Sequence, residues 1–151
     1  MKQSLFLSLF LGVLTLISSV HAETTPTEAA NILVVKKLID AFQDEPPQPE
    51  KVAALLTDDA YMKWAQTDPP AVGRAAILQK LQVAMKPGAK FRITVSDTYA
   101  AGAVVINKRA DQYFINGGFS PPAQLIGFFV VENGKIKTWV DYIIPNTDKA
   151  K

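Results

Sequence analysis

The spacing of apolar residues changes partway along the chain, and this change constrains the fold more than any other feature. Over residues 26–85 apolar residues recur every three or four positions, as on one face of a helix. From Phe91 onward they recur at every second position, as on one face of a strand. Because helices precede strands, we predict an α+β fold, with one curved sheet covered on one face by helices.

Three helices are predicted before the strands. The first begins after Thr25, because Thr25 and Glu28 are spaced for a capping box with a proline at the first helical position. It ends by Glu45, because two prolines follow and cannot continue a helix. The second is a short helix over residues 49–56, and the third covers residues 73–85.

The strands are predicted from the two-residue period and from the turn residues that separate them. Asn133 and Gly134 form a strong signal for a two-residue hairpin between the last two strands. A sheet that curls around a helix encloses a concave space, which is a common place for a ligand. The predicted strands cover residues 60–65, 91–96, 104–114, 123–132 and 135–144.

Residues 1–22 have the features of a secretory signal peptide. Lys2 gives a positively charged start, an apolar stretch with interspersed serines follows, and Ala22 ends a small-residue exit. A membrane anchor is the alternative interpretation of this stretch. Cleavage after Ala22 would leave residues 23–151 as a single domain, periplasmic or secreted, with no membrane attachment.

The composition of residues 23–151 restricts the chemistry. The sequence has no cysteine, and its one histidine, His21, would leave with the signal peptide. A cysteine nucleophile, a Ser–His–Asp relay, a histidine base and a Cys/His zinc site are therefore excluded in the mature chain. Loss of Lys2 leaves 16 − 1 = 15 basic residues against 14 acidic ones. This balance gives no electrostatic reason to expect nucleic acid or anionic lipid as a partner.

Two aspartates lie in predicted strands, where aspartate is disfavoured. Strict alternation places Asp111 on the same face as Arg109, and Asp141 on the same face as Trp139 and Ile143. A carboxylate in apolar surroundings raises its pKa or binds a cation, and Arg109 is the obvious cation. One interpretation is a buried ion pair that fixes strand register. The other is a catalytic site, in which two carboxylates around one guanidinium act as base and acid.

Three motifs extend this pattern to a family. Residues 105–111 contain R-x-D, residues 69–74 read P-P-A-V-G-R, and residues 128–142 end in G-K-I-K-T-W-V-D-Y. Together they resemble the limonene-1,2-epoxide hydrolase family of the NTF2-like (SnoaL-like) superfamily, over nearly all of residues 23–151. The resemblance implies an NTF2-like cone, in which a curved antiparallel or mixed sheet wraps around N-terminal helices and a deep apolar cavity.

The resemblance also implies a hydrolase that needs no cofactor or metal and adds water to a small lipophilic epoxide in one step, giving a diol. Asp141 would deprotonate the water, a protonated Asp111 would donate to the epoxide oxygen, and Arg109 would bridge the two. The family orients the water with a Tyr-x-Asn pair. Here Tyr61 stands near the expected place, but Lys63 occupies the position expected for the asparagine.

Other polar and aromatic residues are candidates for the remaining roles. Tyr61, Trp64 or Asn107 could position the water, and Trp64, Tyr113 and Trp139 could line the cavity. The missing asparagine leaves a non-catalytic binding module for an apolar ligand or partner as the alternative function. An isomerase of the SnoaL or ketosteroid isomerase type is a further alternative.

Two further features concern metals and assembly. Asp58 and Asp59 could resemble a metal-binding pair, but at a helix–strand junction they are more typical of a cap and a solvated turn. No calcium-loop motif is present, and no metal site is expected. The apolar stretch 128–131 is typical of a core or a dimer face, so we expect a homodimer.

Overall fold

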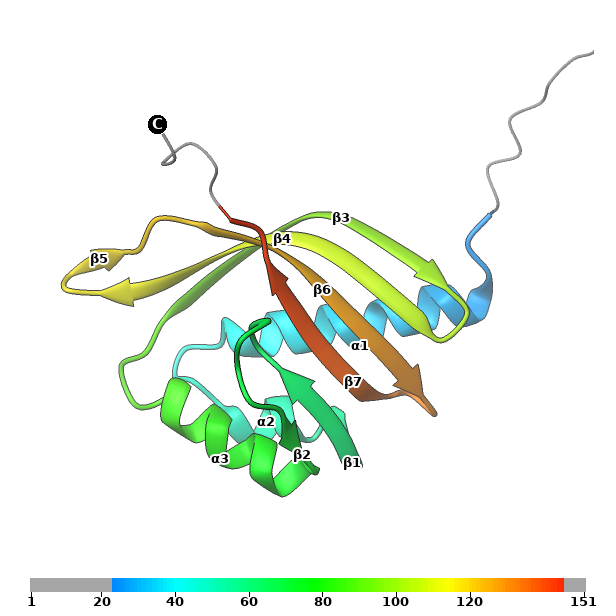
Figure 1. The fold of residues 1–151 in the computed structure, drawn as a ribbon, viewed down its shortest axis with the longest axis horizontal. Coiled ribbons are helices and arrows are strands. Elements are labelled where there is room, and N and C mark those ends of the chain that lie inside the picture. The colour runs from blue at the N-terminus through cyan, green and yellow to red at the C-terminus, as the bar shows by residue number, and fades with distance from the viewer. Residues whose placement is uncertain (1–22, 146–151) are drawn as a thin grey trace, which may run out of the picture.

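Helices form the first part of the structure and strands dominate the rest, as the change of period predicts (Figure 1). The computed structural model describes residues 23–145. The predicted signal peptide and its cleavage site lie outside the described residues. No helix in the described part of the chain is long and apolar enough to span a membrane.

The elements follow one another in a simple order. They are α1 (Pro26–Phe42), α2 (Pro49–Ala53), β1 (Leu56–Lys63), β2 (Ala71–Val72), α3 (Arg74–Ala84), β3 (Phe91–Ala101), β4 (Val104–Ile115), β5 (Gly118–Phe119), β6 (Ala123–Glu132) and β7 (Lys135–Ile143).

The strands form one curved, unclosed sheet with the order β2-β1-β7-β6-β4-β3, and β5 pairs with the far end of β4. The pairing of β1 with β7 is parallel and the other pairings are antiparallel, so the sheet is mixed. Helix α1 crosses one face of the sheet, and α2 and α3 lie beside β1 and β2 (Figure 1). Apolar residues of all three helices join the inner face of the sheet in one core.

Local chemistry explains where α1 begins. Thr25 Oγ1 accepts from the Glu28 N–H at 3.2 Å, and Glu28 Oε2 accepts from the Thr25 N–H at 2.8 Å, which confirms the capping box. Glu28 Oε1 also accepts from the Gly102 N–H, and Asn31 Nδ2 donates to the Gly102 carbonyl. The start of α1 is thereby tied to the turn between β3 and β4.

The predicted second helix is too long. Helix α2 ends at Ala53 and β1 begins at Leu56, so Asp58 and Asp59 lie inside a strand rather than in a helix cap. The reason is long-range, because Leu56 pairs with Ile136 in the parallel ladder to β7. Both aspartates are exposed and form surface ion pairs, with Arg74 and Lys137 respectively. Among residues 23–145 no group of three or more potential metal ligands is found.

The strands after residue 90 follow the prediction closely. β6 has the predicted bounds, and the other strands differ at their ends, chiefly β3, which continues to Ala101 instead of residue 96. A register shift between Val95 and Asp97 interrupts the alternation there, which explains the early end of the predicted strand. Asn133 and Gly134 have φ of 50° and 74°, the left-handed conformation that the predicted hairpin turn requires.

Candidate active site

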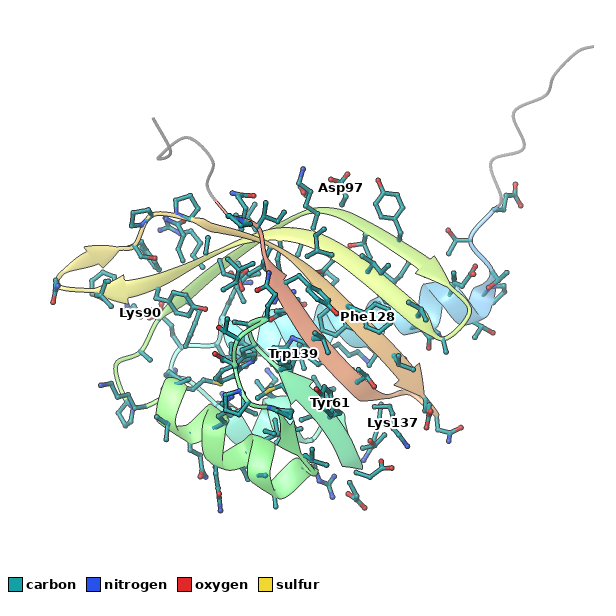
Figure 2. The ribbon with its side chains drawn as sticks, in the orientation of Figure 1. Tyr61, Lys90, Asp97, Phe128, Lys137 and Trp139 are labelled. Carbon is teal, nitrogen blue, oxygen red and sulfur yellow. The ribbon has the colours of Figure 1, made fainter. Side chains whose placement is uncertain are left out.

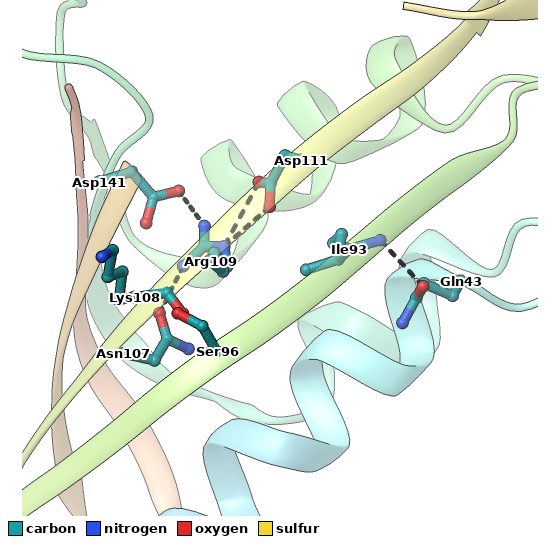
Figure 3. Close-up of polar contacts among 8 residues, drawn as sticks. All are labelled: Gln43, Ile93, Ser96, Asn107, Lys108, Arg109, Asp111 and Asp141. Atoms are coloured by element: carbon teal, nitrogen blue, oxygen red, sulfur yellow. Dashed lines mark hydrogen bonds and ion pairs between the residues drawn. The ribbon is translucent and has the colours of Figure 1, made fainter. Parts of the chain in front are cut away.

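Arg109 is the centre of a buried polar cluster on the inner face of the sheet (Figure 3). The Arg109 residue is 2% exposed. Nε donates to Asp111 at 3.1 Å, Nη2 donates to Asp141 Oδ2 at 2.7 Å, and Nη1 donates to Asn107 Oδ1 at 3.0 Å. The structure therefore brings Arg109, Asp111 and Asp141 together within hydrogen-bond distance.

The register of three neighbouring strands brings these side chains close together. The inward positions of β4 include Asn107, Arg109 and Asp111, because side chains alternate along a strand. On β6, Gly127 lies opposite Asn107, and on β7 Asp141 lies opposite Gly127. The Arg109 guanidinium can thus reach across β6 from β4 to a carboxylate on β7.

Gly127 makes this reach possible. A Cβ atom at this position would clash with Arg109 Nη1 and would lie 2.6 Å from Asn107 Oδ1. The missing side chain leaves the space that the guanidinium fills. Our sequence analysis does not identify Gly127 as a site residue. Its signal is a lone glycine in the middle of an apolar strand, which often marks a close approach of another group.

The cluster forms part of the wall of an apolar cavity of about 200 Å³. Arg109, Asp111 and Asp141 supply the charged part of the wall. Most of the remaining lining is aliphatic or aromatic and comes from α1, α3, β3, β4, β6, β7 and the residue that follows β1. Examples are Ile39 and Phe42 from α1, Phe91 from β3, Leu125 from β6 and Ile143 from β7.

Several aromatic side chains line the cavity, and the three candidate lining residues, Trp64, Tyr113 and Trp139, all lie in its wall. Trp139 is buried beneath the sheet (Figure 2), packed edge-on against Phe42 at 5.5 Å and Trp64 at 6.0 Å between ring centroids. It also stacks on Phe129 at 6.3 Å. Tyr113 is about half exposed.

The structure does not support Tyr61 as a residue that positions water. Ala60 and Met62 are buried and point inward, so Tyr61 and Lys63 lie on the opposite face of β1. Neither residue lines the cavity. The resemblance to the family suggests Tyr61 by its place in the sequence, but a shift of one residue moves a side chain to the other face of a sheet. Trp64, the residue that follows β1, does line the cavity.

Asn107 also differs from its expected role. It is buried on the inner face of β4, but its side-chain oxygen accepts from Arg109 and it does not line the cavity beside the carboxylates. It lines a second cavity instead, between α1 and β3. Asn107 therefore binds Nη1 of the Arg109 guanidinium, whereas Nε and Nη2 bind the two carboxylates.

The cluster places two carboxylates around one cation. Burial raises the pKa of Asp141 to about 6, against the opposing effect of Arg109. Burial also raises the pKa of Asp111, and Arg109 again opposes the shift. With both carboxylates ionised the buried cluster would carry a net charge of −1. Burial therefore makes both carboxylates easier to protonate than exposed aspartates are.

A curved mixed sheet that wraps around helices and encloses an apolar cavity defines the NTF2-like class, which includes the SnoaL-like proteins. The chain belongs to the limonene-1,2-epoxide hydrolase family, because the model of that family's catalytic domain matches residues 29–146. This match confirms the resemblance in the sequence motifs, and similar solved structures confirm the α+β class. None of the curated proteins compared with the chain matches it.

Solved structures with the same fold come from several bacteria. An LEH-like epoxide hydrolase from M. tuberculosis has 25% identity and a TM-score of 0.69, over 79% of this chain and 86% of that one. A SnoaL-like protein from Jannaschia sp. CCS1, assigned as a polyketide cyclase, has 13% identity and a TM-score of 0.66, over 80% and 90%. A protein with a ketosteroid isomerase-like fold from Catenulispora acidiphila has 17% identity and a TM-score of 0.62, over 72% and 83%. The last two show the fold alone.

Proposed function

We propose that this protein is an epoxide hydrolase of the limonene-1,2-epoxide hydrolase type, which adds water to a small lipophilic epoxide in one step and gives a diol. One observation carries the proposal: Arg109 binds Asp111 and Asp141 at the wall of one apolar cavity. Membership of the family supports it independently.

The reaction needs one proton acceptor and one proton donor, and the hydrogen bonds of the two aspartates suggest which takes each role. Asp141 Oδ2 accepts from Arg109, whereas Oδ1 has no hydrogen-bond partner among the described residues. Oδ1 is therefore available to take a proton from water. Both oxygens of Asp111 lie near Arg109 Nε, at 3.1 and 3.3 Å, so one can accept from Arg109 while the other carries a proton.

The proposed step conserves atoms and charge. Asp141 takes a proton from water as the water oxygen forms a bond to one epoxide carbon, and the bond from that carbon to the ring oxygen breaks. Protonated Asp111 gives its proton to the ring oxygen as negative charge develops there. The Arg109 guanidinium stabilises both carboxylates as their charges exchange. Return of one proton from Asp141 to Asp111 completes the cycle.

The cavity supports a small lipophilic substrate. Its lining is mostly apolar, and its volume of about 200 Å³ limits the size of the ring system that can enter. Apolar walls keep bulk water away from the reacting carbon, and they hold the epoxide in one orientation relative to the two carboxylates.

The proposal is tested with a panel of small lipophilic epoxides and two variants. We expect the wild type to form diol, and Asp141→Asn to lower kcat/KM by about 10²- to 10⁴-fold, because it removes the general base. Asp97→Asn is the matched control, because Asp97 is an exposed strand aspartate on the outside of the molecule (Figure 2). Equal activity of the wild type and a folded Asp141→Asn variant would contradict the proposed role of Asp141.

A binding module without turnover is the second candidate function. It is favoured by one observation, that Tyr61 and Lys63 lie on the outer face, so β1 offers no Tyr-x-Asn pair to the cavity. This function predicts that no epoxide of the panel gives diol, while an apolar ligand raises the melting temperature. An isomerase would convert an unsaturated ketone in the same assay without taking up water.

A further inference from the structure

Two buried polar atoms in the cavity wall have no hydrogen-bond partner among the residues that the structure describes. They are Trp139 Nε1 and Asp141 Oδ1. Their side chains belong to residues that are 3% and 4% exposed, two positions apart on the inner face of β7. A buried donor or acceptor left unpaired costs free energy, so such groups in a native protein are usually paired with protein or water.

Both side chains are held in fixed positions. The Trp139 ring is enclosed by Phe42, Trp64 and Phe129, which fixes the direction of its N–H. Asp141 is fixed by the 2.7 Å bond from Arg109 Nη2 to its other carboxylate oxygen. The unpaired donor and the unpaired acceptor are thus preorganised before any ligand enters.

We propose that Trp139 Nε1 and Asp141 Oδ1 together hold the water molecule that attacks the epoxide, and this inference rests on the proposed function. The water accepts from the indole N–H and donates one hydrogen to Oδ1. Its second lone pair stays free to form the bond to the epoxide carbon, and Oδ1 receives the proton.

Tyr61 and Asn107, two of the residues suggested from the sequence for this task, do not line the cavity. Tyr61 and Lys63 lie on the other face of the sheet, and Asn107 is bound to Arg109 outside this cavity. The indole N–H also favours the charged form of Asp141, although it lies outside the geometry of a direct hydrogen bond to the carboxylate. A water bound to both groups would satisfy the donor and the acceptor at the same time.

The kinetic test compares Trp139→Phe with Trp64→Phe. Both variants remove an indole from the same cavity wall, but Trp139 alone presents its N–H beside Asp141 as an unpaired buried donor. We expect Trp139→Phe to lower kcat by about 10- to 100-fold with KM within about twofold, because it removes water orientation and keeps an apolar wall. Trp64→Phe should change KM more than kcat. Equal loss of kcat in both variants would show that Trp139 acts through packing, and would overturn the inference.

A second measurement does not depend on turnover. A high-resolution crystal structure of the wild type should show a water within hydrogen-bond distance of both atoms, and the Trp139→Phe structure should lack it. If no water contacts both atoms in the wild type, the inference fails even where Asp141→Asn abolishes hydrolysis and the proposed function stands. If the water is present but no epoxide gives diol, the proposed function fails, and the role of this water as nucleophile fails with it.

Discussion

At the scale of single residues, the site depends on one buried cation between two buried carboxylates. Arg109 suits this position because its planar guanidinium presents donors in several directions, and here three side chains use them. Only one carboxylate oxygen of Asp141 accepts a hydrogen bond from Arg109. Burial is the main cause of the raised pKa of Asp141, which is about 6. The folded protein therefore bears a cost for keeping Asp141 ionised near neutral pH.

This cost predicts a pH-dependent difference in stability between the wild type and Asp141→Asn. The pKa of Asp141 is raised from 3.8 to about 6 in the folded state, so the native protein binds this proton more tightly than the unfolded chain. The proton on Asp141 therefore stabilises the folded state at low pH, and this contribution to stability is lost as pH rises through the folded-state pKa. The rise of this pKa from 3.8 to about 6 corresponds to about 3 kcal/mol at most.

Urea unfolding across the range from about pH 4 to about pH 8 measures this effect. Relative to Asp141→Asn, the wild type should lose stability as pH rises and should level off above about pH 7. Asp97→Asn should follow the wild type, because Asp97 is exposed and distant from the cluster. A difference between wild type and Asp141→Asn that stays constant over this range would contradict the assigned burial cost.

The charged residues of the cluster were predictable, whereas the orientation of Tyr61 and the role of Gly127 were not. The strict two-residue period assigns Arg109 and Asp111 to one face of a strand, whichever strand lies beside it. Tyr61 could not be placed in this way, because its face depends on how β1 pairs with β7, a contact between distant parts of the sequence. Gly127 has no side chain that a motif could reveal, and its role appears only when Arg109 is seen to fill the space beside it.

At the scale of elements, β6 is a spacer between the strands that carry the charges. It lies between β4 and β7 in the sheet, and Gly127 is the point where the guanidinium passes over it. The hairpin that joins β6 to β7 fixes the register of Gly127 against Asp141. Local turn chemistry at Asn133 and Gly134 therefore contributes to the alignment of the site.

Gly127→Ala tests the role of β6 as this spacer. The added methyl group would clash with Arg109 Nη1, so the guanidinium must move away from its partners. We expect a loss of about 1–3 kcal/mol in the free energy of unfolding. We also expect a fall of about 100-fold in kcat/KM, because Arg109 would no longer align both carboxylates.

The matched control for this variant is Gly118→Ala in β5. No atom lies within 4 Å of a Cβ added at Gly118, so the methyl group should be tolerated there. Chemical denaturation and steady-state kinetics on the two variants give the comparison. If Gly127→Ala retained wild-type stability and activity, the guanidinium would not need the space that the glycine leaves.

Local signals explain which elements could be predicted. The capping box of α1 and the hairpin turn depend on neighbouring residues, and both formed as expected. The start of β1 depends on pairing between Leu56 and Ile136, which no local pattern reports. The short strands β2 and β5 also depend on their partners, β1 and β4, and the periodicity did not indicate them.

At the scale of the whole molecule, the two faces of the sheet differ. The inner face holds the core and the site, whereas the outer face carries partly exposed apolar side chains. The stretch 128–131 divides between them, because Phe129 and Val131 are buried in the core while Phe128 and Val130 are only partly buried. Ile106 pairs with Phe128, and Ile126 pairs with Tyr142, so apolar side chains form a continuous patch across β4, β6 and β7.

We propose that a second copy of the chain covers this patch, and that the protein is exported as residues 23–151. Light scattering on the purified mature chain should give about twice the monomer mass, and Phe128→Asp should shift it toward the monomer, because a buried charge opposes association. Thr94→Asp, exposed on the same face of the sheet but in the edge strand β3, outside β4, β6 and β7, serves as the control. A monomeric wild type at micromolar concentration would contradict the dimer.

The most direct test of the Asp–Arg–Asp site as an activator of water is a single turnover in heavy-oxygen water, with the protein in excess over an epoxide that it hydrolyses. We expect every diol from this first turnover to carry one heavy oxygen atom, and peptides that contain Asp111 or Asp141 to stay unlabelled. The opposite result is an unlabelled diol in the first turnover with the label later in one of these carboxylates. That result would mean that the aspartate itself attacks the epoxide and would contradict direct attack by water.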